Sequence, residues 1–338
     1  MTIDLEEMSL TDQRWRSFVA GAPGVTLFHR AEWTAVVSET YGFKSFALIG
    51  RERGEAVAGA PFLKIGRPFR HRWCSLPYTD ALTPAGESGA AERFVGALAQ
   101  RARDGISSVE LRAAFDVSGA HPRVAGVRHI LPLTEGADAV IRRIAPAHLR
   151  NARHAERAGV EISVGTADED VEGFYSLHVR TRRRLGLPVQ PARFFRNLAA
   201  ELIAPGFGYI ATAQLGRRRL AAAVFLCSGR TLVYKYGASD EREWSYRPND
   251  LLFRTVIADA ASRGFRELDF GRTDVADAGL RRFKSGWGAE EAPLVYTVLG
   301  DSRHRSAASA VRLISPLIRR MTPSFSRALG EVLYRYSA

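Results

Sequence analysis

Cysteine and lysine are both scarce in this sequence of 338 residues. The two cysteines, Cys74 and Cys227, lie far apart in apolar segments, without the Cys-x-x-Cys or histidine-rich spacing of a zinc site. We therefore expect two buried free thiols and no metal, because a free cysteine behaves as a small hydrophobic side chain. Only four of the 48 cationic residues are lysines, so a lysine in a suggestive position is informative.

The sequence also lacks a secretory leader and a long apolar run. Residues 1–10 contain three acidic side chains and no basic start followed by an apolar stretch. No segment approaches the roughly 20 apolar residues of a membrane-spanning helix. These absences predict a cytoplasmic protein.

Common nucleotide and hydrolase motifs are missing. The chain has no Gly-x-x-x-x-Gly-Lys-Ser/Thr loop, no Gly-x-Gly-x-x-Gly and no Gly-x-Ser-x-Gly. Its eight histidines show no triad spacing. Arg51-x-x-Gly54-x-Ala56 matches an acetyl-CoA signature, but it falls on an expected hairpin turn rather than a helix start. We therefore discount it as a phosphate site.

The chain has instead a large positive charge, +12 at pH 7. This charge favours a polyanionic partner such as RNA, a phosphate-rich cofactor or an anionic membrane. Residues 139–200 contain 11 arginines and 6 acids, and residues 301–338 contain 7 arginines and 2 acids. Pro316 and Pro323 are expected to break the tail into two short helices. The second helix places Phe325, Leu329 and Leu333 on one apolar stripe. The tail therefore either lies on a membrane or docks on the protein's own core.

The two halves of the chain repeat one order of elements. Strand, turn, strand, strand, helix and strand are expected over residues 43–113 and again over 209–270. Gly59–Leu63 lines up with Ala222–Leu226, and Arg103-Asp104-Gly105 with Ser262-Arg263-Gly264. We therefore predict an α/β chain with mixed sheets: a first lobe over 1–135, a second over 136–300, and a helical tail over 301–338.

Four short segments are the most informative motifs. They are Ser75-Leu76-Pro77-Tyr78-Thr79-Asp80, Tyr234-Lys235-Tyr236-Gly237, Asp269-Phe270-Gly271, and Phe283-Lys284-Ser285-Gly286-Trp287-Gly288. With these residues the sequence resembles the Fem-like branch of the GNAT acyltransferase superfamily, from about Phe28 to Leu299. The resemblance implies two tandem GNAT-like lobes. The chain resembles the compact members of this branch, because the segment from Phe174 to Leu202 has no inserted helical arm of the kind that some Fem ligases contain.

The resemblance also implies the chemistry. In this superfamily an amine attacks the carbonyl of an activated ester or thioester, and the enzyme positions both and stabilises the oxyanion. Lys284 matches the lysine that stands near the donor's acyl end, and a surface lysine is the alternative. Asp80 matches an acidic residue beside the acceptor amine that takes its proton. A turn-capping aspartate is the alternative there.

The candidate substrate-binding residues have ordinary alternatives as well. Arg184 matches an arginine that holds acceptor phosphates, or it ends a solvated basic helix. Tyr236 should share a face with Tyr234, pointing into a cleft or into the core. Arg247 and Asn249 flank Pro248 at an expected helix start, where a donor phosphate would meet free N–H groups. Phe283, Trp287 and Trp244 either stack on a base or lie buried.

Three functions remain open from the sequence. The first is aminoacyl transfer from aminoacyl-tRNA to a peptide, a peptidoglycan precursor or a natural-product amine, without a cofactor. The second is acyl-CoA-dependent N-acylation of an amino sugar in envelope or exopolysaccharide synthesis, with the tail at the inner face of the membrane. The third is a non-catalytic RNA- or membrane-binding scaffold. The intact Phe283-Lys284 and Asp80 motifs favour an enzyme.

Overall fold

The computed structural model describes the whole chain except residues 1–2, 68–69, 104–107, 301–306 and 335–338. The described residues form two compact units. The first contains 3–126 and 293–300, and the second contains 127–292 and 307–334, apart from the gaps just named. Each unit is a mixed α/β structure with its own set of neighbouring strands and its own core, so the predicted fold class is confirmed.

In the first unit, the strands run in the order β1-β2-β3-β4-β6-β13, with β5 beside β3. All neighbouring pairs with a defined register are antiparallel except β4 and β6, in which Trp73 pairs with Val109. A parallel pair needs a crossover, and α3 provides it. The elements are β1 (Asp4–Met8), α1 (Gln13–Gly21), η1 (Leu27–His29), α2 (Ala31–Tyr41), β2 (Lys44–Glu52), β3 (Glu55–Arg67), β4 (Arg70–Cys74), β5 (Ala85–Gly86), α3 (Ala90–Arg103), β6 (Ser108–Leu111) and, from the end of the second half, β13 (Glu290–Gly300).

In the second unit, the order β8-β9-β10-β11-β12-β7 repeats this plan. Again one pair is parallel, β11 with β12, and α8 is its crossover. The elements are β7 (Ala120–Pro132), α4 (Ala137–Arg143), α5 (Pro146–Arg157), β8 (Glu161–Gly165), α6 (Asp168–Leu185), α7 (Ala192–Leu198), η2 (Ala199–Ile203), β9 (Gly208–Leu215), β10 (Arg218–Ser228), β11 (Thr231–Ser239), η3 (Glu241–Tyr246), α8 (Pro248–Ser262), β12 (Glu267–Thr273) and α9 (Ala278–Gly286).

Each sheet takes one strand from the other half of the sequence. The strand that follows β6 in the chain, β7, pairs with β12, with Leu131 opposite Leu268. The strand that follows β12 and α9, β13, pairs with β6, with Thr297 opposite Leu111. The sequence predicted the repeated order of elements, and the structure adds this exchange of strands.

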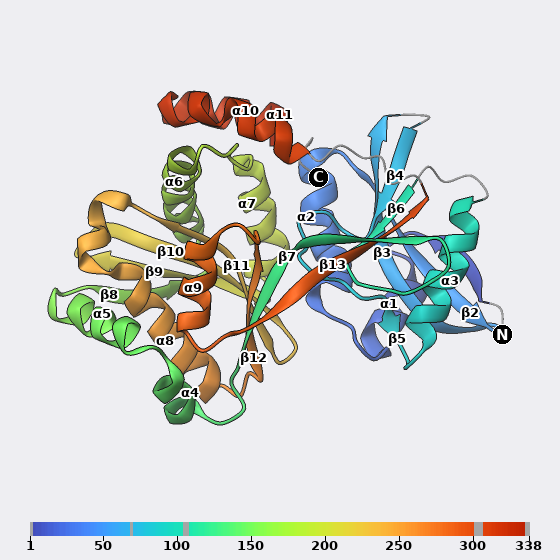
Figure 1. The fold of residues 1–338 in the computed structure, drawn as a ribbon, viewed down its shortest axis with the longest axis horizontal. Helices are drawn as coiled ribbons and strands as arrows, with labels where there is room; N and C mark the ends of the chain where they lie inside the picture. The colour runs from blue at the N-terminus through green and yellow to red at the C-terminus, as the bar shows by residue number, and fades with distance from the viewer. Residues whose placement is uncertain (1–2, 68–69, 104–107, 301–306, 335–338) are drawn as a thin grey trace. The chain divides into compact units, whose positions relative to one another are not determined.

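Helices cover both faces of the second sheet (Figure 1). On one face α4, α5, α8 and α9 share a core with the strands, in which Phe225, Phe253, Phe270 and Trp287 are buried. Helices α6 and α7 pack on the other face, where Phe174, Phe194 and Phe195 form a second aromatic layer. The two faces of β11 therefore meet different environments.

The tail docks on the second unit. Its helices, α10 (Ala307–Arg320) and α11 (Pro323–Leu333), both contact α6. Gly330 of α11 lies so close to the Val189 backbone that a Cβ on this glycine would be 2.0 Å from the Val189 carbonyl oxygen. Helix α10 continues through Pro316, which we expected to break it, and the chain turns only after Arg320. The predicted stripe is partly exposed, since Phe325 is 59% exposed.

Both cysteines are free: Cys74 is fully buried and Cys227 is half-buried. In the part of the chain that the structure describes, no cluster of three or more His, Cys, Asp or Glu side chains is arranged to hold a metal ion. None of the described helices is long and apolar enough to cross a membrane.

Candidate functional site

The parallel strands β11 and β12 separate part-way along their length. Thr231 to Val233 pair with Glu267 to Asp269, and beyond Asp269 the described strands no longer pair. At this end β11 leads through η3 into the first turn of α8. Ligands of α/β sheets bind at the carboxyl ends of parallel strands, where helix N–H groups also point. The region where β11 and β12 stop pairing is therefore the candidate site of the second unit.

In this region β12 is an irregular strand. Its pairing with β7 shifts register between Asp269 and Arg272, and Gly271 has φ 68°, a value that glycine adopts without strain. The Asp269 carboxylate accepts the Gly271 N–H at 2.7 Å and pairs with the Arg128 guanidinium, also at 2.7 Å. Asp269-Phe270-Gly271 is thus the sequence of a β-bulge held by a buried carboxylate.

Lys284 fixes the other side of the same bulge. Its side chain is buried, and Nζ donates to the carbonyl oxygens of Gly271 at 3.0 Å and Arg272 at 3.2 Å. The alternative of a surface lysine is therefore wrong. A buried ammonium needs such partners, because desolvation without them is costly. The structure places a positive charge at the carboxyl end of β12.

His129, on β7, is a fully buried neighbour of this lysine. Burial and the positive charge of Lys284 lower the pKa of its imidazole, and its Nε2 lies 3.1 Å from a carboxylate oxygen of Glu291. Both effects favour the neutral form of His129.

Phe283 and Trp287, from the same motif as Lys284, pack around a histidine side chain and do not form an open stacking surface. The His148 ring lies 4.4 Å from the Trp287 ring, nearly parallel to it, and 5.4 Å from Phe283, edge to face. Trp287 is fully buried and Phe283 half-buried. His148 Nδ1 lies 2.5 Å from the Asp250 carboxylate in the first turn of α8. A Cβ on Gly286 would lie only 2.5 Å from His148 Nε2.

This cluster links three helices around the start of α8. His148 belongs to α5, Asp250 to α8, and Phe283 and Trp287 to the end of α9. The Ala145 N–H also donates to the Gly286 carbonyl at 2.8 Å, which ties the start of α5 to α9. A carboxylate bonded to one ring nitrogen orients the imidazole, so the arrangement positions the start of α8.

Tyr234 and Tyr236 do not share a face, contrary to the expectation from alternation. The β10–β11 register pairs Val224 with Tyr236 but Phe225 with Tyr234, so Lys235 is an extra residue in β11. Tyr234 points into the core beside Phe253, and burial raises the pKa of its hydroxyl to about 12. Tyr236 points to the opposite face, toward α6 and α7.

The surroundings of Tyr236 include a buried histidine. Tyr236 is half-buried, and its ring lies 6.2 Å from that of His178, on α6. His178 Nε2 lies 2.7 Å from the Gln190 side-chain oxygen, and burial lowers the pKa of the imidazole to about 3. His178 is therefore neutral near pH 7.

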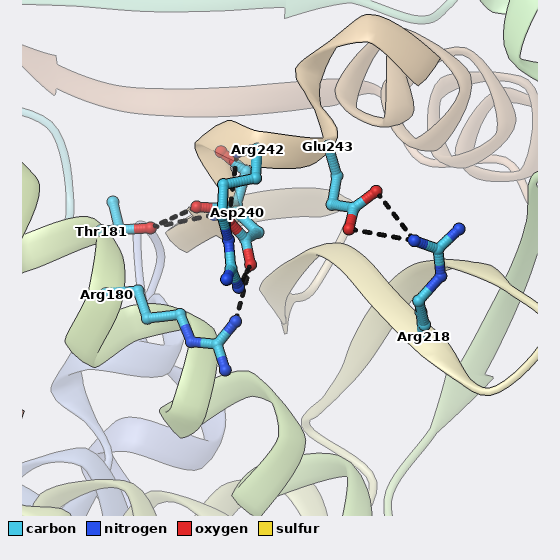
Figure 2. A network of polar contacts seen from close by, with 7 residues as sticks. Arg180, Thr181, Arg218, Asp240, Arg242 and Glu243 are labelled. Atoms are coloured by element: carbon cyan, nitrogen blue, oxygen red, sulfur yellow. Dashed lines mark hydrogen bonds and ion pairs between the residues drawn. The ribbon is translucent and has the colours of Figure 1, made fainter.

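Beyond β11 lies a network of arginines around Asp240, shown in Figure 2. The Asp240 carboxylate is buried and accepts from Arg242 and Arg180, each at 2.6 Å. These two guanidinium groups hold the pKa of Asp240 well below its usual range. Thr181 Oγ1 donates to the Ser239 carbonyl and accepts the Ser239 N–H, both at 3.0 Å. The network fixes the end of β11 to α6.

Arg184 lies at the basic end of α6 beside this network. Its guanidinium is 4.6 Å from the Trp244 ring centre, and its Nε is 3.5 Å from a carboxylate oxygen of Glu241. Trp244 is 41% exposed and donates from Nε1 to Ser239 Oγ at 3.0 Å. Trp244, unlike Trp287, presents an aromatic surface to solvent.

Arg247 and Asn249 lie where the sequence predicted them, at the start of α8. Arg247 is exposed with φ 56°, and Pro248 occupies the first position of the helix. Proline suits this position because the first helical N–H has no partner within the helix. Asn249 is half-buried in the first turn, next to Asp250.

Asp80 belongs to the first unit, in the loop that follows β4. Leu76 has φ 62° and Tyr78 φ 64°, both unusual for residues other than glycine. The Tyr296 hydroxyl donates to the Asp80 carbonyl oxygen at 2.8 Å, and Trp33 donates to Thr79 at 2.7 Å. Strain of this kind persists where the surroundings hold the backbone in place, and it is common at functional sites.

Sequence reasoning missed the residues that reach the motifs from distant segments. These are His148, Asp250, His129, Asp240 and Arg128. The only local signal was for Asp250, an acidic residue in the first turn of a helix that begins at Pro248. The other partners are set by tertiary packing.

Comparisons with known proteins place this fold. The acetyltransferase (GNAT) domain family matches residues 146–291. FemX is similar in structure, with a TM-score of 0.68, 15% identity, and coverage of 92% of this chain and 100% of that chain. L-PGS from Bacillus licheniformis is also similar, with a TM-score of 0.56, 13% identity, and coverage of 93% of this chain and 99% of that chain. A comparison with curated protein sequences gives no match.

A tandem GNAT protein from the clavulanic acid biosynthesis pathway is also similar. The TM-score is 0.52 at 12% identity, over 88% of this chain and 100% of that one. Identities this low show likeness of fold. Together with the matched domain, they confirm the two tandem GNAT-like lobes and the Fem-like architecture that the motifs predicted.

Proposed function

We propose that this chain is an acyltransferase that forms amide bonds with aminoacyl-tRNA as its donor, because residues 146–291 match the acetyltransferase (GNAT) domain family and the fold is similar to that of FemX. The observation that carries the proposal is the loss of pairing between β11 and β12 at their carboxyl ends, where β11 leads to the start of α8 and the Lys284 ammonium binds β12 carbonyls. An anionic donor whose acyl group lies near developing negative charge suits these features.

In the proposed reaction the acceptor's neutral amine attacks the ester carbonyl of the donor. A C–N bond forms, the C–O bond to the terminal ribose breaks, and the amine's proton ends on the released ribose oxygen. No oxidation state changes, so the step needs no redox cofactor. The charge of Lys284 stabilises the oxyanion that forms on the ester carbonyl.

The acceptor is proposed to be an amine on a peptide, a peptidoglycan precursor or a natural product. Arg184 and the exposed ring of Trp244 would bind phosphate or a base, and Tyr236 would contact the acceptor. In this proposal Arg247 and Asn249 meet the donor phosphates at the first turn of α8.

An acyl-CoA donor is the second candidate, favoured by the acetyltransferase description of the matched domain. One assay separates the two. The purified protein is incubated with an amine acceptor and either radiolabelled aminoacyl-tRNA, with and without RNase pretreatment, or radiolabelled acyl-CoA. We expect RNase-sensitive transfer from the aminoacyl-tRNA. Transfer from acyl-CoA alone, or transfer that survives RNase, would refute the tRNA donor.

We also propose that the tail contacts the inner face of the membrane when the acceptor is a lipid-linked precursor. Leu317 and Phe325 are each 59% exposed, and Arg319 and Arg320 next to them are exposed. Exposed apolar side chains flanked by arginines suit an anionic lipid surface. Flotation with anionic vesicles tests this contact, which Leu317→Ser with Phe325→Ser should abolish. Equal flotation of the variant would contradict it.

A further inference from the structure

The outward face of α5 is a stripe of arginines. Arg150, Arg153 and Arg157 are three and four residues apart, so they lie on one side of the helix, and all three are exposed. Together with Glu156 they line a shallow hollow on the surface. At about 1.5 Å of rise per residue, the three charges lie along about 10 Å of helix.

These three arginines differ from many arginines elsewhere in the chain. Arg14, for example, pairs with Glu6, and Arg281 pairs with Glu291. Across the described residues, no carboxylate lies within ion-pair distance of the three stripe arginines. The one acid among them, Glu156, is paired with Arg254 of α8. The stripe therefore keeps about three uncompensated positive charges.

The stripe has no exposed large apolar side chain. The inner side of α5 packs on α8 through buried Ala152 and Ala155, and the outer side presents arginine, His154 and Glu156. A helix that lies in a membrane interface needs an outward apolar face, which this one lacks. A surface that is charged without being apolar fits a hydrated polyanion.

We propose that the α5 stripe binds the phosphate backbone of RNA, namely the acceptor stem of the donor tRNA. The inference rests on the proposed tRNA donor and adds the surface that holds the tRNA body. The start of α5 is bonded to Gly286, so the stripe runs along the helix away from the Phe283-Lys284 motif. A nucleic-acid duplex carries roughly one charge per 1.7 Å, so 10 Å of stripe faces several phosphates.

Binding of deacylated tRNA to the full chain tests the stripe without any transfer step. The variant is Arg150→Ala/Arg153→Ala/Arg157→Ala, measured by filter binding from 50 to 200 mM salt. We expect the slope of log affinity against log salt to become shallower by roughly 2 to 3, at about 0.7 to 0.9 per lost phosphate contact. Over this fourfold range, wild type should then lose roughly 15- to 60-fold more affinity than the variant.

Two further variants make the result specific. Arg16→Ala/Arg217→Ala/Arg230→Ala removes three exposed arginines from other elements, so it changes the net charge equally and should keep the wild-type slope. Replacing the stripe arginines with lysines should also keep it, since the charges remain. Equal slopes for the stripe variant and the control variant would overturn the proposal.

Failure of this inference is distinguishable from failure of the proposed function. If the wild-type protein transfers from aminoacyl-tRNA and the stripe variant binds and uses tRNA equally well, the proposed RNA-binding role of the stripe is refuted and the proposed tRNA donor is supported. If transfer occurs only from acyl-CoA but the stripe variant still loses salt-dependent RNA binding, the RNA-binding role of the stripe is supported and the proposed tRNA donor is refuted. If the stripe variant lost binding to anionic vesicles but kept its binding to tRNA, the proposal that the stripe binds RNA would also be overturned.

Discussion

Replacing Lys284 with methionine keeps the apolar stem and removes the ammonium. In the folded chain Nζ is buried and donates to the Gly271 and Arg272 carbonyls at 3.0 and 3.2 Å. A buried acceptor left without its donor costs about 1–3 kcal/mol, and removing the buried charge offsets part of this. We expect a net loss of about 2–4 kcal/mol in the free energy of unfolding. For a unit of this size that lowers Tm by roughly 5–15 °C.

The same substitution tests the chemistry if turnover is measured well below the lowered Tm. Loss of one preformed group that stabilises an oxyanion reduces kcat by about a hundredfold or more. Circular dichroism establishes that the variant is folded at the assay temperature. Lys44→Met, at an exposed lysine of β2, is the control and should change neither quantity.

Two results would refute this reasoning in different ways. Wild-type turnover by folded Lys284→Met protein would leave Lys284 a role in holding the β12 bulge and remove it from the mechanism. An unchanged Tm would show that the two buried hydrogen bonds contribute little, which contradicts the structural argument.

Two other predictions concern stability. Gly286→Ala should destabilise the chain by about 1–3 kcal/mol, because the new Cβ would lie 2.5 Å from His148 Nε2, whereas Gly279→Ala in the same helix has its nearest contact at 3.6 Å and should not destabilise. Urea unfolding compares the two, and equal midpoints would contradict the crowding. Burial lowers the pKa of folded His178 to about 3 from 6.5, so the unfolded chain binds more protons between these values. Stability should therefore fall as pH drops through this window, by up to about 1.4 kcal/mol per pH unit, and His178→Gln should flatten the pH dependence of the urea midpoint. An unchanged slope in that variant would count against the buried neutral imidazole.

The repeated order of elements was predictable because its signals are local. The turn at Arg53 and Gly54, for example, has φ 52° and 88°, the positive values typical of a tight hairpin. Alternating apolar residues and helical periodicity gave the strands and helices of both halves to within a few residues. The motif at Phe283-Lys284 pointed to the family for the same reason, since it is one continuous segment.

The arrangement around the site was less predictable. Alternation predicted one face for Tyr234 and Tyr236, but a one-residue bulge at Lys235 puts them on opposite faces. A bulge is a property of two paired strands, so it depends on β10 as much as on β11. The partner of the Asp250 carboxylate, His148, is 102 residues away in the chain.

The sequence by itself determined the elements, the duplicated order, the Fem-like resemblance and the concentration of arginine in two segments. Only the tertiary structure decided that β7 pairs with β12 and β13 with β6, that Lys284 is buried against a bulge, and that the α5 arginines remain unpaired while Glu156 pairs with Arg254. The physical reason is the distance along the chain over which each effect acts. Backbone preference and periodicity act over a few residues, whereas strand exchange, burial of a charge and the choice of an ion-pair partner depend on which distant segments pack together.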